Sequence, residues 1–457
     1  MKRREFLQAS TGAGLAWATG NDSSPAEPSR RTPPAPEQIT WNRRVPVRYQ
    51  ADVAVIGGGM AGVSAACAAA RSGAKVLLVE RFAVTGGNAT VGGVASFCGE
   101  TRGQGEVFDA IVAELERFDA IARYQPYEKR ESRVFDHEIL AVVLQELLLK
   151  RGVKLLLHTR FVDAAVSDGR ISECIVCGKS GPEALRARQF IDCSGEGELA
   201  RAAGCTTLKG RPEDGLQLPM SLMFFVRHVD DKHVRVQMPE GWLEPILDAE
   251  DLPMTSVWPN GPGGNALKIK IPMFDSSDTE SMTAAEIRAR QRMMQVLDYY
   301  QRQRERPWLL DHCSPQIGIR EGQRVLGDYV LTVEDLRAGR KFDDAIARGV
   351  FYLDGHKPDD DKRTYILPKN ELRVPPYQIP LRCLLVRDAR NLLVAGRCFS
   401  AEQLALSSAR VMTTCAMMGQ AAGITAALAV QRQCDLRDIN PQEVRRSVEQ
   451  HGALLDG

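Results

Sequence analysis

Short apolar runs alternate with a helical pattern at the start of the folded part of the chain. Ala51–Ile56 (ADVAVI) is a Val-rich run, and Lys75–Val79 (KVLLV) is a second one. Between them, the Ala-rich segment Val63–Arg71 is typical of a helix, which Gly73 ends. Continuous apolar runs of this length are typical of parallel strands buried on both faces. The pattern predicts a strand, a helix and a second strand over residues 51–79, and therefore an α/β fold.

Later blocks of the chain extend this pattern. Val153–Arg188 alternates apolar and polar residues and contains Asp168-Gly169, a strong hairpin signal, which predicts a small antiparallel meander. Phe190–Gly197 (FIDCSGEG) is a short strand pattern that ends in a glycine turn. Leu392–Ala395 is another such strand, and a long Ala-rich helix follows it from Val411.

Glycines stand where the first predicted strand meets the helix. The sequence Gly57-Gly58-Gly59-Met60-Ala61-Gly62 is a GxGxxG motif, and Glu80 follows the second strand. In this context, Gly57 allows a tight turn, Gly59 lets the backbone approach a pyrophosphate, and Gly62 lets the helix pack closely on the strand. Glu80 is expected to accept hydrogen bonds from an adenosine ribose. The block therefore predicts a dinucleotide site at a helix N-terminus.

The residues after Glu80 carry a family resemblance. Glu80-Arg81 followed by Gly86-Gly87-Asn88-Ala89-Thr90 resembles the FAD-binding start of the glutathione-reductase-like flavoproteins. More narrowly, it resembles the FAD-dependent oxidoreductase family related to the flavin domain of heterodisulfide reductase. The block from Leu392 resembles the C-terminal FAD motif, in which a helix N-terminus faces the flavin. The resemblance implies FAD contacts from Gly57, Gly59, Met60, Ala61, Gly62, Glu80, Arg81, Gly86, Gly87, Asn88, Ala89, Thr90, Ser194, Gly195, Gly396, Arg397 and Met412.

The resemblance also predicts the organisation of the chain. Residues 46–210 and 381–457 are expected to form a Rossmann-like FAD-binding domain, with a parallel sheet, helices on both faces and the meander as an insert. Residues 211–380 contain a β-rich segment and an amphipathic helical pattern, and are expected to form an inserted α+β substrate domain. Residues 1–45 are expected to be a signal and a linker.

The N-terminus resembles a twin-arginine export signal. Met1–Leu7 (MKRREFL) has paired arginines, and a weakly apolar stretch, Ala9–Ala18, follows it. The segment Asn21–Pro36 is rich in Pro and Ser, which is a linker composition. The sequence therefore predicts passage through the twin-arginine translocase to the periplasm or cell envelope, with a basic disordered terminus as the alternative.

Charge and cysteine content narrow the choice of partners. Lys and Arg total 59 and Asp and Glu total 58 among 457 residues, so the net charge of +1 favours neither nucleic acid nor anionic lipid. The 11 cysteines are scattered, and Cys174 to Cys177 is the single CxxC. This spacing predicts no metal site, and a [4Fe-4S] cluster is disfavoured although relatives of the family carry one.

One apolar segment could be mistaken for a membrane span. Val411–Val430 contains no charged residue, and Gly419 and Gly423 imitate a membrane dimer motif. Its many Ala and Thr residues make transfer into lipid unfavourable and suit close packing on a sheet. We therefore expect no integral membrane span.

Catalytic candidates come from the middle of the chain. If the flavin takes a hydride from a carbon, a base must take the accompanying proton. His356 has the residue type for this role, and Arg320 and Glu321 either orient a polar substrate or pair with each other. Cys98 lacks the partner cysteine of a dithiol site, which disfavours disulfide reduction.

These observations favour an exported FAD-dependent dehydrogenase or oxidase. It would transfer a hydride from a small organic substrate to flavin N5 and pass electrons to an unidentified acceptor. One alternative is an electron-transfer protein resembling the flavin subunit of heterodisulfide reductase, with a [4Fe-4S] cluster. Another is a flavin-binding module without catalysis.

Overall fold

The computed structural model describes residue 37 and residues 39–121, 132–230, 236–261, 263–302, 304 and 306–456. Residues 45–457 form one compact unit. The predicted export signal and most of the predicted linker lie outside the described residues.

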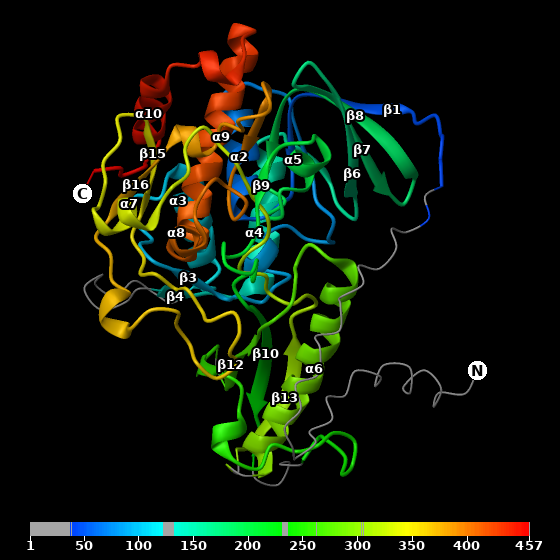
Figure 1. The fold of residues 1–457 in the computed structure, drawn as a ribbon, viewed down its shortest axis with the longest axis vertical. Coiled ribbons are helices and arrows are strands. Elements are labelled where there is room, and N and C mark those ends of the chain that lie inside the picture. Colours follow the sequence, from blue (N-terminus) through cyan, green and yellow to red (C-terminus); the bar gives the residue numbers. More distant parts are fainter. Residues whose placement is uncertain are drawn as a thin grey trace, which may run out of the picture. The chain divides into compact units, whose positions relative to one another are not determined.

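A mixed sheet forms the centre of this unit (Figure 1). Its order is β5-β2-β1-β8-β7-β6, and β17 also pairs with β8. The strands β5, β2, β1, β8 and β17 are parallel, whereas β7 runs antiparallel to both of its neighbours, β8 and β6. The bounds are β1 Val47–Ile56, β2 Val76–Val79, β5 Lys154–Leu156, β6 Arg160–Ser167, β7 Arg170–Gly178, β8 Gly181–Asp192 and β17 Leu392–Val394. The predicted α/β class, with its antiparallel meander, is confirmed.

Two long helices pack directly against each other beside this sheet. They are α2 (Met60–Arg71) and α9 (Met412–Arg432), which lie side by side in Figure 1. A Cβ atom on Gly419 would lie 2.0 Å from the carbonyl oxygen of Ala61, and one on Gly423 would lie 2.2 Å from that of Ala65. The two glycines therefore let the helix backbones approach more closely than any side chain would allow.

The helix α9 is the segment with the composition of a membrane span. It is long and apolar enough to cross a bilayer, but 94% of its most apolar window is buried inside the unit. Among the described residues it is the one helix that meets these criteria. Because its surface is covered by protein, it is a core helix.

A second sheet carries its own hydrophobic core. Its order is β11-β12-β10-β13, all antiparallel, and α6 (Thr279–Arg302) lies along it in Figure 1. The alternate residues Leu222, Phe224 and Val226 of β10 join the α6 cluster. Met223 and Phe225 face the other way, toward Gly93. The bounds are β10 Met220–His228, β11 Thr255–Pro259, β12 Gly264–Ile271 and β13 Trp308–Cys313.

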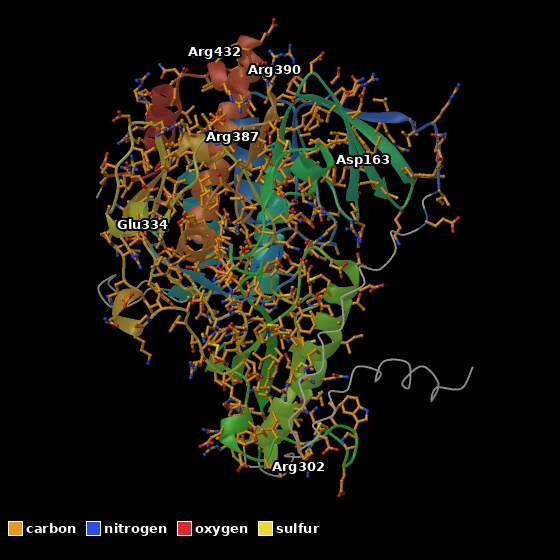
Figure 2. The ribbon with its side chains drawn as sticks, viewed as in Figure 1. Asp163, Arg302, Glu334, Arg387, Arg390 and Arg432 are labelled. Atoms are coloured by element: carbon orange, nitrogen blue, oxygen red, sulfur yellow. The ribbon has the colours of Figure 1, made fainter. Side chains whose placement is uncertain are left out.

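The remaining elements complete the unit. The helices are α3 Glu106–Arg117, α4 His137–Lys150, α5 Glu198–Ala202, α7 Val333–Arg337, α8 Gln403–Ala409 and α10 Pro441–Gln450. The strands are β3 Ser96–Cys98, β4 Ser132–Val134, β9 Thr207–Leu208, β14 Arg324–Val325, β15 Ala345–Gly349 and β16 Tyr377–Pro380. Charged side chains such as Asp163, Glu334 and Arg432 lie at the periphery (Figure 2).

Candidate functional site

A groove opens where β1, β2 and β8 end. Among the residues predicted to contact FAD, fifteen line it: Gly57, Gly59, Met60, Ala61, Glu80, Arg81, Gly86, Gly87, Asn88, Ala89, Ser194, Gly195, Gly396, Arg397 and Met412. Gly62 and Thr90 do not line the groove. A ligand at the carboxyl ends of parallel strands is the usual arrangement in open α/β sheets.

Two glycines hold the turn before α2 together. Gly57 has φ +99°, and a Cβ atom there would lie 2.4 Å from the carbonyl oxygen of Cys193. A Cβ on Gly62 would lie 1.9 Å from the carbonyl oxygen of Gly57. Thr90 Oγ1 donates a hydrogen bond to the carbonyl of Thr85, 2.8 Å away, which closes the loop under the groove. Gly62 therefore acts in helix packing, as its position in the motif predicts.

Two helix N-termini open into the groove without a capping side chain. Gly59 precedes α2 and Val411 precedes α9, and neither residue forms a side-chain cap. No acidic residue lies in the first turn of either helix. The first backbone N–H groups of both helices are therefore free to bind an anion or an electron-rich ring, as an FAD pyrophosphate and flavin would require. The residues present fit this cofactor.

Glu80 is held in place at the end of β2. Its carboxylate accepts hydrogen bonds from the backbone N–H of Gly58 at 2.7 Å and of Phe82 at 2.9 Å. Burial raises the pKa of Glu80, and these hydrogen bonds partly oppose that rise. The carboxylate is thus oriented by backbone donors and keeps lone pairs for a ribose.

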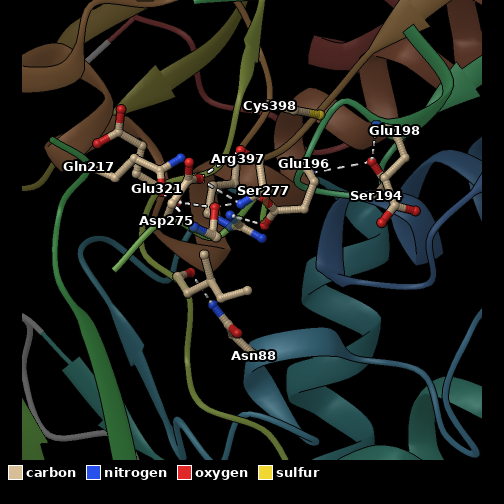
Figure 3. A network of polar contacts seen from close by, with 12 residues as sticks. Asn88, Ser194, Glu196, Glu198, Gln217, Asp275, Ser277, Glu321, Arg397 and Cys398 are labelled. Atoms are coloured by element: carbon tan, nitrogen blue, oxygen red, sulfur yellow. Dashed lines mark hydrogen bonds and ion pairs between the residues drawn. The ribbon is translucent and has the colours of Figure 1, made fainter. Parts of the chain in front are cut away.

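Arg397 joins the groove to the loop before α6 (Figure 3). Its Nη1 lies 2.7 Å from Glu196 Oε1, and both side chains are largely buried. Glu196 also accepts a hydrogen bond from Ser276 Oγ at 2.9 Å, and Asn88 Nδ2 donates to the carbonyl of Ile319 at 2.9 Å. The cofactor segment and the second-sheet segment are therefore joined by direct polar contacts.

Other groove residues were not predicted from the sequence. Thr159 and Phe161 enter the groove at the meander, Gln316 enters it from a distant segment, and Arg410 and Cys415 flank the predicted residue Met412. Thr159, Phe161 and Gln316 belong to no glycine motif or recognisable spacing, so only the tertiary structure brings these three residues to the groove.

Arg320 and Glu321, two of the three catalytic candidates, lie in different environments. Arg320 Nη1 donates to Ser221 Oγ at 2.6 Å and to the carbonyl of Pro219 at 2.8 Å. Glu321 accepts from the backbone N–H of Leu218 at 2.7 Å and pairs with Arg324 at 3.4 Å. Arg320 and Glu321 therefore do not pair with each other. Burial raises the pKa of Glu321.

His356 is 1% exposed and does not line the groove. Its Nε2 lies 3.0 Å from Asp354 Oδ1, and its buried Nδ1 has no partner among the described residues. Burial, followed by the positive charge of Arg320, lowers the pKa of His356 to about 3 against the pull of Asp354. The imidazole is therefore neutral at physiological pH, and its role as the base stays a prediction.

The buried neutral His356 makes stability depend on pH. The unfolded chain binds a proton at this residue below about pH 6.5, whereas the folded protein does not until about pH 3. Lowering the pH from 7 to 5 should therefore cost about 2 kcal/mol of unfolding free energy through this residue. Asp354, Arg320, Lys268 and Tyr365 surround the imidazole, and Asp354 stays ionised over this range.

Urea unfolding at pH 7 and pH 5 measures this dependence. His356→Gln should lose about 2 kcal/mol less than the unaltered protein over the interval. The exposed His228→Gln should retain the full dependence. Equal pH dependence in the unaltered protein and His356→Gln would contradict the expectation.

Metal ligands do not gather in the described part of the chain. No group of three or more His, Cys, Asp and Glu side chains could hold an ion there. The 11 cysteines are all free, and Cys174 is buried in β7.

Known proteins resemble this chain to different degrees. Thiamine thiazole synthase from Pyrococcus abyssi is 28% identical over 160 residues, which are 32% of this chain and 58% of that protein. The chain thus spans less than two thirds of that relative's length. The aromatic hydroxylase CabE is 15% identical with a TM-score of 0.48, covering 88% of this chain and 68% of that one. The p-nitrophenol 4-monooxygenase PnpA from Pseudomonas putida DLL-E4 is 12% identical with a TM-score of 0.47, covering 88% of both chains.

These structural likenesses are too distant to indicate an activity. The family profile described as FAD dependent oxidoreductase, by contrast, matches residues 52–448, which is nearly the whole compact unit. This match covers the glycine turn, the groove and both uncapped helix N-termini. The chain therefore belongs to the FAD-dependent oxidoreductase family and is an oxidoreductase enzyme.

Proposed function

We propose that this enzyme binds FAD in the groove and oxidises a small organic substrate by hydride transfer to the flavin. The observation that carries the proposal is the pair of uncapped helix N-termini that open into one groove. One meets the glycine turn at Gly57 and the other meets the Gly396-Arg397 turn. An extended cofactor with a pyrophosphate and an electron-rich ring would accept hydrogen bonds from, or place negative charge beside, the free N–H groups at both helix N-termini.

The residues of the chain have separate tasks in this proposal. Glu80 would hold the ribose, the N-terminus of α2 would hold the pyrophosphate, and the N-terminus of α9 would stabilise negative charge on the flavin ring. FAD, when bound, supplies a two-electron acceptor. Arg397 keeps Glu196 paired beside the cofactor, so that neither charge is left unbalanced in the buried groove.

The substrate would enter beside Arg410 and Met412. Both residues line the groove at the start of α9. Thr413 follows them and donates a hydrogen bond from Oγ1 to the carbonyl of Cys98 at 3.1 Å. The segment that follows Gly92 and Gly93 is thereby fixed between α9 and the second sheet, which packs on Gly93 through Met223. This end of the groove is where substrate and flavin would meet.

A visible absorption spectrum of the purified protein tests the proposal. We expect a flavin spectrum that bleaches on anaerobic addition of one class among sugars, alcohols, amines and acids. A flavin spectrum that no class bleaches would favour the electron-transfer or flavin-binding alternatives. A well-folded protein that never binds flavin would overturn the proposal. Iron analysis of the same sample separates the alternatives, because a protein with a [4Fe-4S] cluster must contain iron.

We also propose the domain division predicted above. The hydrophobic core formed by α6 and the second sheet has members from Met220 to Ile319. It supports a separate substrate domain within residues 211–380. The later part of that range, with β15 and β16, packs into the large core of the first sheet. The proposed substrate domain and FAD-binding domain therefore share part of one hydrophobic core.

Export by the twin-arginine route is a further part of the proposal. It is supported by the paired arginines Arg3 and Arg4 and by the Pro-rich segment after them. A cofactor bound in a buried groove requires a folded protein, which that translocase carries. Cell fractionation tests it: purely cytoplasmic protein with an intact N-terminus would overturn it.

A further inference from the structure

Three cationic side chains, Arg410, Arg320 and Lys268, gather around the carboxylate of Asp354 at the α9 end of the groove. Arg410 Nη2 lies 2.9 Å from Asp354 Oδ2, and His356 Nε2 lies 3.0 Å from Asp354 Oδ1. Arg320 and Lys268 lie close enough to interact electrostatically with the same carboxylate. We call Arg320, Lys268, Arg410 and Asp354 the cationic cluster.

The strand alternation of the second sheet places Lys268 in this cluster. Leu267 and Ile269, its neighbours on β12, join the α6 core, so Lys268 lies on the opposite face. There it is paired in register with Met223 on β10. Arg320 reaches the same face, where its Nη1 donates to Ser221 Oγ. Lys268 and Arg320, together with Lys270, therefore make the face that packs on Gly93 basic.

The charges in the cluster do not balance. Asp354 forms an ion pair with Arg410 and a hydrogen bond with the neutral His356, and neither Arg320 nor Lys268 forms an ion pair in the described part of the chain. Arg320 uses only Nη1 in hydrogen bonds there, so its Nε and Nη2 donors remain. Buried or partly buried cations without an anionic partner are costly to a protein.

Neighbouring acids do not supply the missing charge. Burial raises the pKa of the Cys98 thiol to about 11 and raises the pKa of Tyr352 further, so both groups stay neutral. Burial and the positive charge of Arg320 lower the pKa of Lys268 to about 8, and burial lowers the pKa of Arg320 to about 10. An anion beside these two cations would stabilise their charged forms.

We propose that the substrate of this enzyme is an organic acid whose carboxylate is bound by Arg320 and Lys268. The inference rests on the proposed function, because the cluster adjoins the end of the groove assigned to the flavin. The remaining Nε and Nη2 donors of a guanidinium form the fork that holds a carboxylate, and the ammonium of Lys268 adds a second contact. Arg410, already paired with Asp354, joins this position to the groove, which it also lines.

Binding of matched acids and amides tests the inference without requiring turnover. The probes are acetate, benzoate, succinate and glucuronate, each compared with its neutral amide, on the FAD-loaded full-length protein at pH 7. Isothermal titration calorimetry and perturbation of the flavin spectrum measure each dissociation constant. We expect at least one acid to bind about tenfold or more tightly than its amide.

Charge variants assign that preference to the cluster. Lys268→Met should abolish the tighter binding of the acid over its amide, whereas Lys268→Arg, which keeps the positive charge, should retain it. The ammonium of Lys268 makes no hydrogen bond in the described structure, so both variants should fold. Arg320→Lys keeps the charge but loses the fork, and should weaken acid binding with little change for the amide. Lys270→Met is the matched control, because Lys270 lies on the same face but donates to the carbonyl of Arg363 at 2.6 Å.

The outcomes separate the two proposals. Acid preference that disappears in Lys268→Met and persists in Lys270→Met supports the inference even if no probe reduces the flavin. Equal binding of acids and amides, or a preference that survives in Lys268→Met, overturns it. If the variants instead shift only the flavin reduction potential and leave acid binding unchanged, the cluster stabilises the negative charge of the reduced flavin and the inference is wrong. Failure of every compound to reduce the flavin would count against the proposed function alone.

Discussion

Gly59→Asp should reduce FAD affinity by about 100-fold or more while leaving the protein folded. Gly59 precedes α2 with an extended backbone of φ −65°, and a Cβ atom there would meet nothing within 4 Å. The new side chain therefore enters the open groove without a clash. Its carboxylate would occupy the free N–H groups of α2 and repel the pyrophosphate, and a like charge at such a position costs several kcal/mol.

The same substitution should stabilise the protein without FAD. Asp is a favourable N-cap residue, and its gain over Gly is a few tenths of a kcal/mol to about 1 kcal/mol. Gly59→Asn is the matched control, because it caps the helix without adding a charge, and we expect it to weaken FAD binding by about tenfold. Fluorescence titration of the FAD-free protein measures the affinity, and thermal unfolding measures the stability. Full FAD occupancy in Gly59→Asp would contradict a pyrophosphate site at this helix.

Gly423→Ala should lower the free energy of unfolding by about 2 to 4 kcal/mol. An added methyl group would lie 2.2 Å from the carbonyl oxygen of Ala65 and 3.0 Å from the backbone nitrogen of Ala69. Because both atoms belong to the backbone of α2, the helices must separate, and overpacking of this kind is costly. Helix propensity predicts the opposite sign, since Ala is favoured over Gly by about 1 kcal/mol inside a helix.

The sign of the effect is therefore the test. Urea unfolding of Gly423→Ala and Gly419→Ala should show destabilisation in both. Ala70→Gly, at a partly buried position of α2, measures the effect of helix propensity alone and should lower the free energy of unfolding by about 1 kcal/mol. Stabilisation by Gly423→Ala would show that the two helices are not in backbone contact. FAD affinity should also fall in Gly423→Ala, because the N-termini of both helices open into the groove.

Local sequence motifs predicted most of the residues that line the groove. The turn at Gly57 and the turn at Gly396 are determined by neighbouring residues, since each follows a strand directly and precedes a helix along the chain. The α/β class followed from the same blocks. The position of Arg397 was also predicted, but its pairing with Glu196 was not, because the partner lies on another strand-to-helix turn.

The cationic cluster beside the groove could not be predicted in this way. Lys268, Asp354 and Arg410 lie far apart in the sequence, and no repeat or spacing connects them. Arg320 and Glu321 are adjacent in sequence, yet they bond to different partners, Ser221 and Arg324. A pairing between them is sterically possible in an isolated peptide, but the surrounding segments hold the two side chains apart. His356 was singled out by residue type, and its burial depends on packing that the sequence pattern does not show.

The glycine contacts between α2 and α9 also have a consequence for cofactor choice. The backbones of the two helices touch at Gly419 and Gly423, so neither helix can slide without moving the other. The distance between their anion-receptive ends is therefore fixed by the protein before any cofactor arrives. In the proposed arrangement, FMN carries both a flavin ring and a phosphate and would therefore reach both helix ends, but it lacks the adenosine ribose that Glu80 would hold. The rigid pair of helix ends would therefore accept the flavin half of either cofactor, and preference for the dinucleotide would depend on Glu80, which backbone donors hold at the other end of the groove.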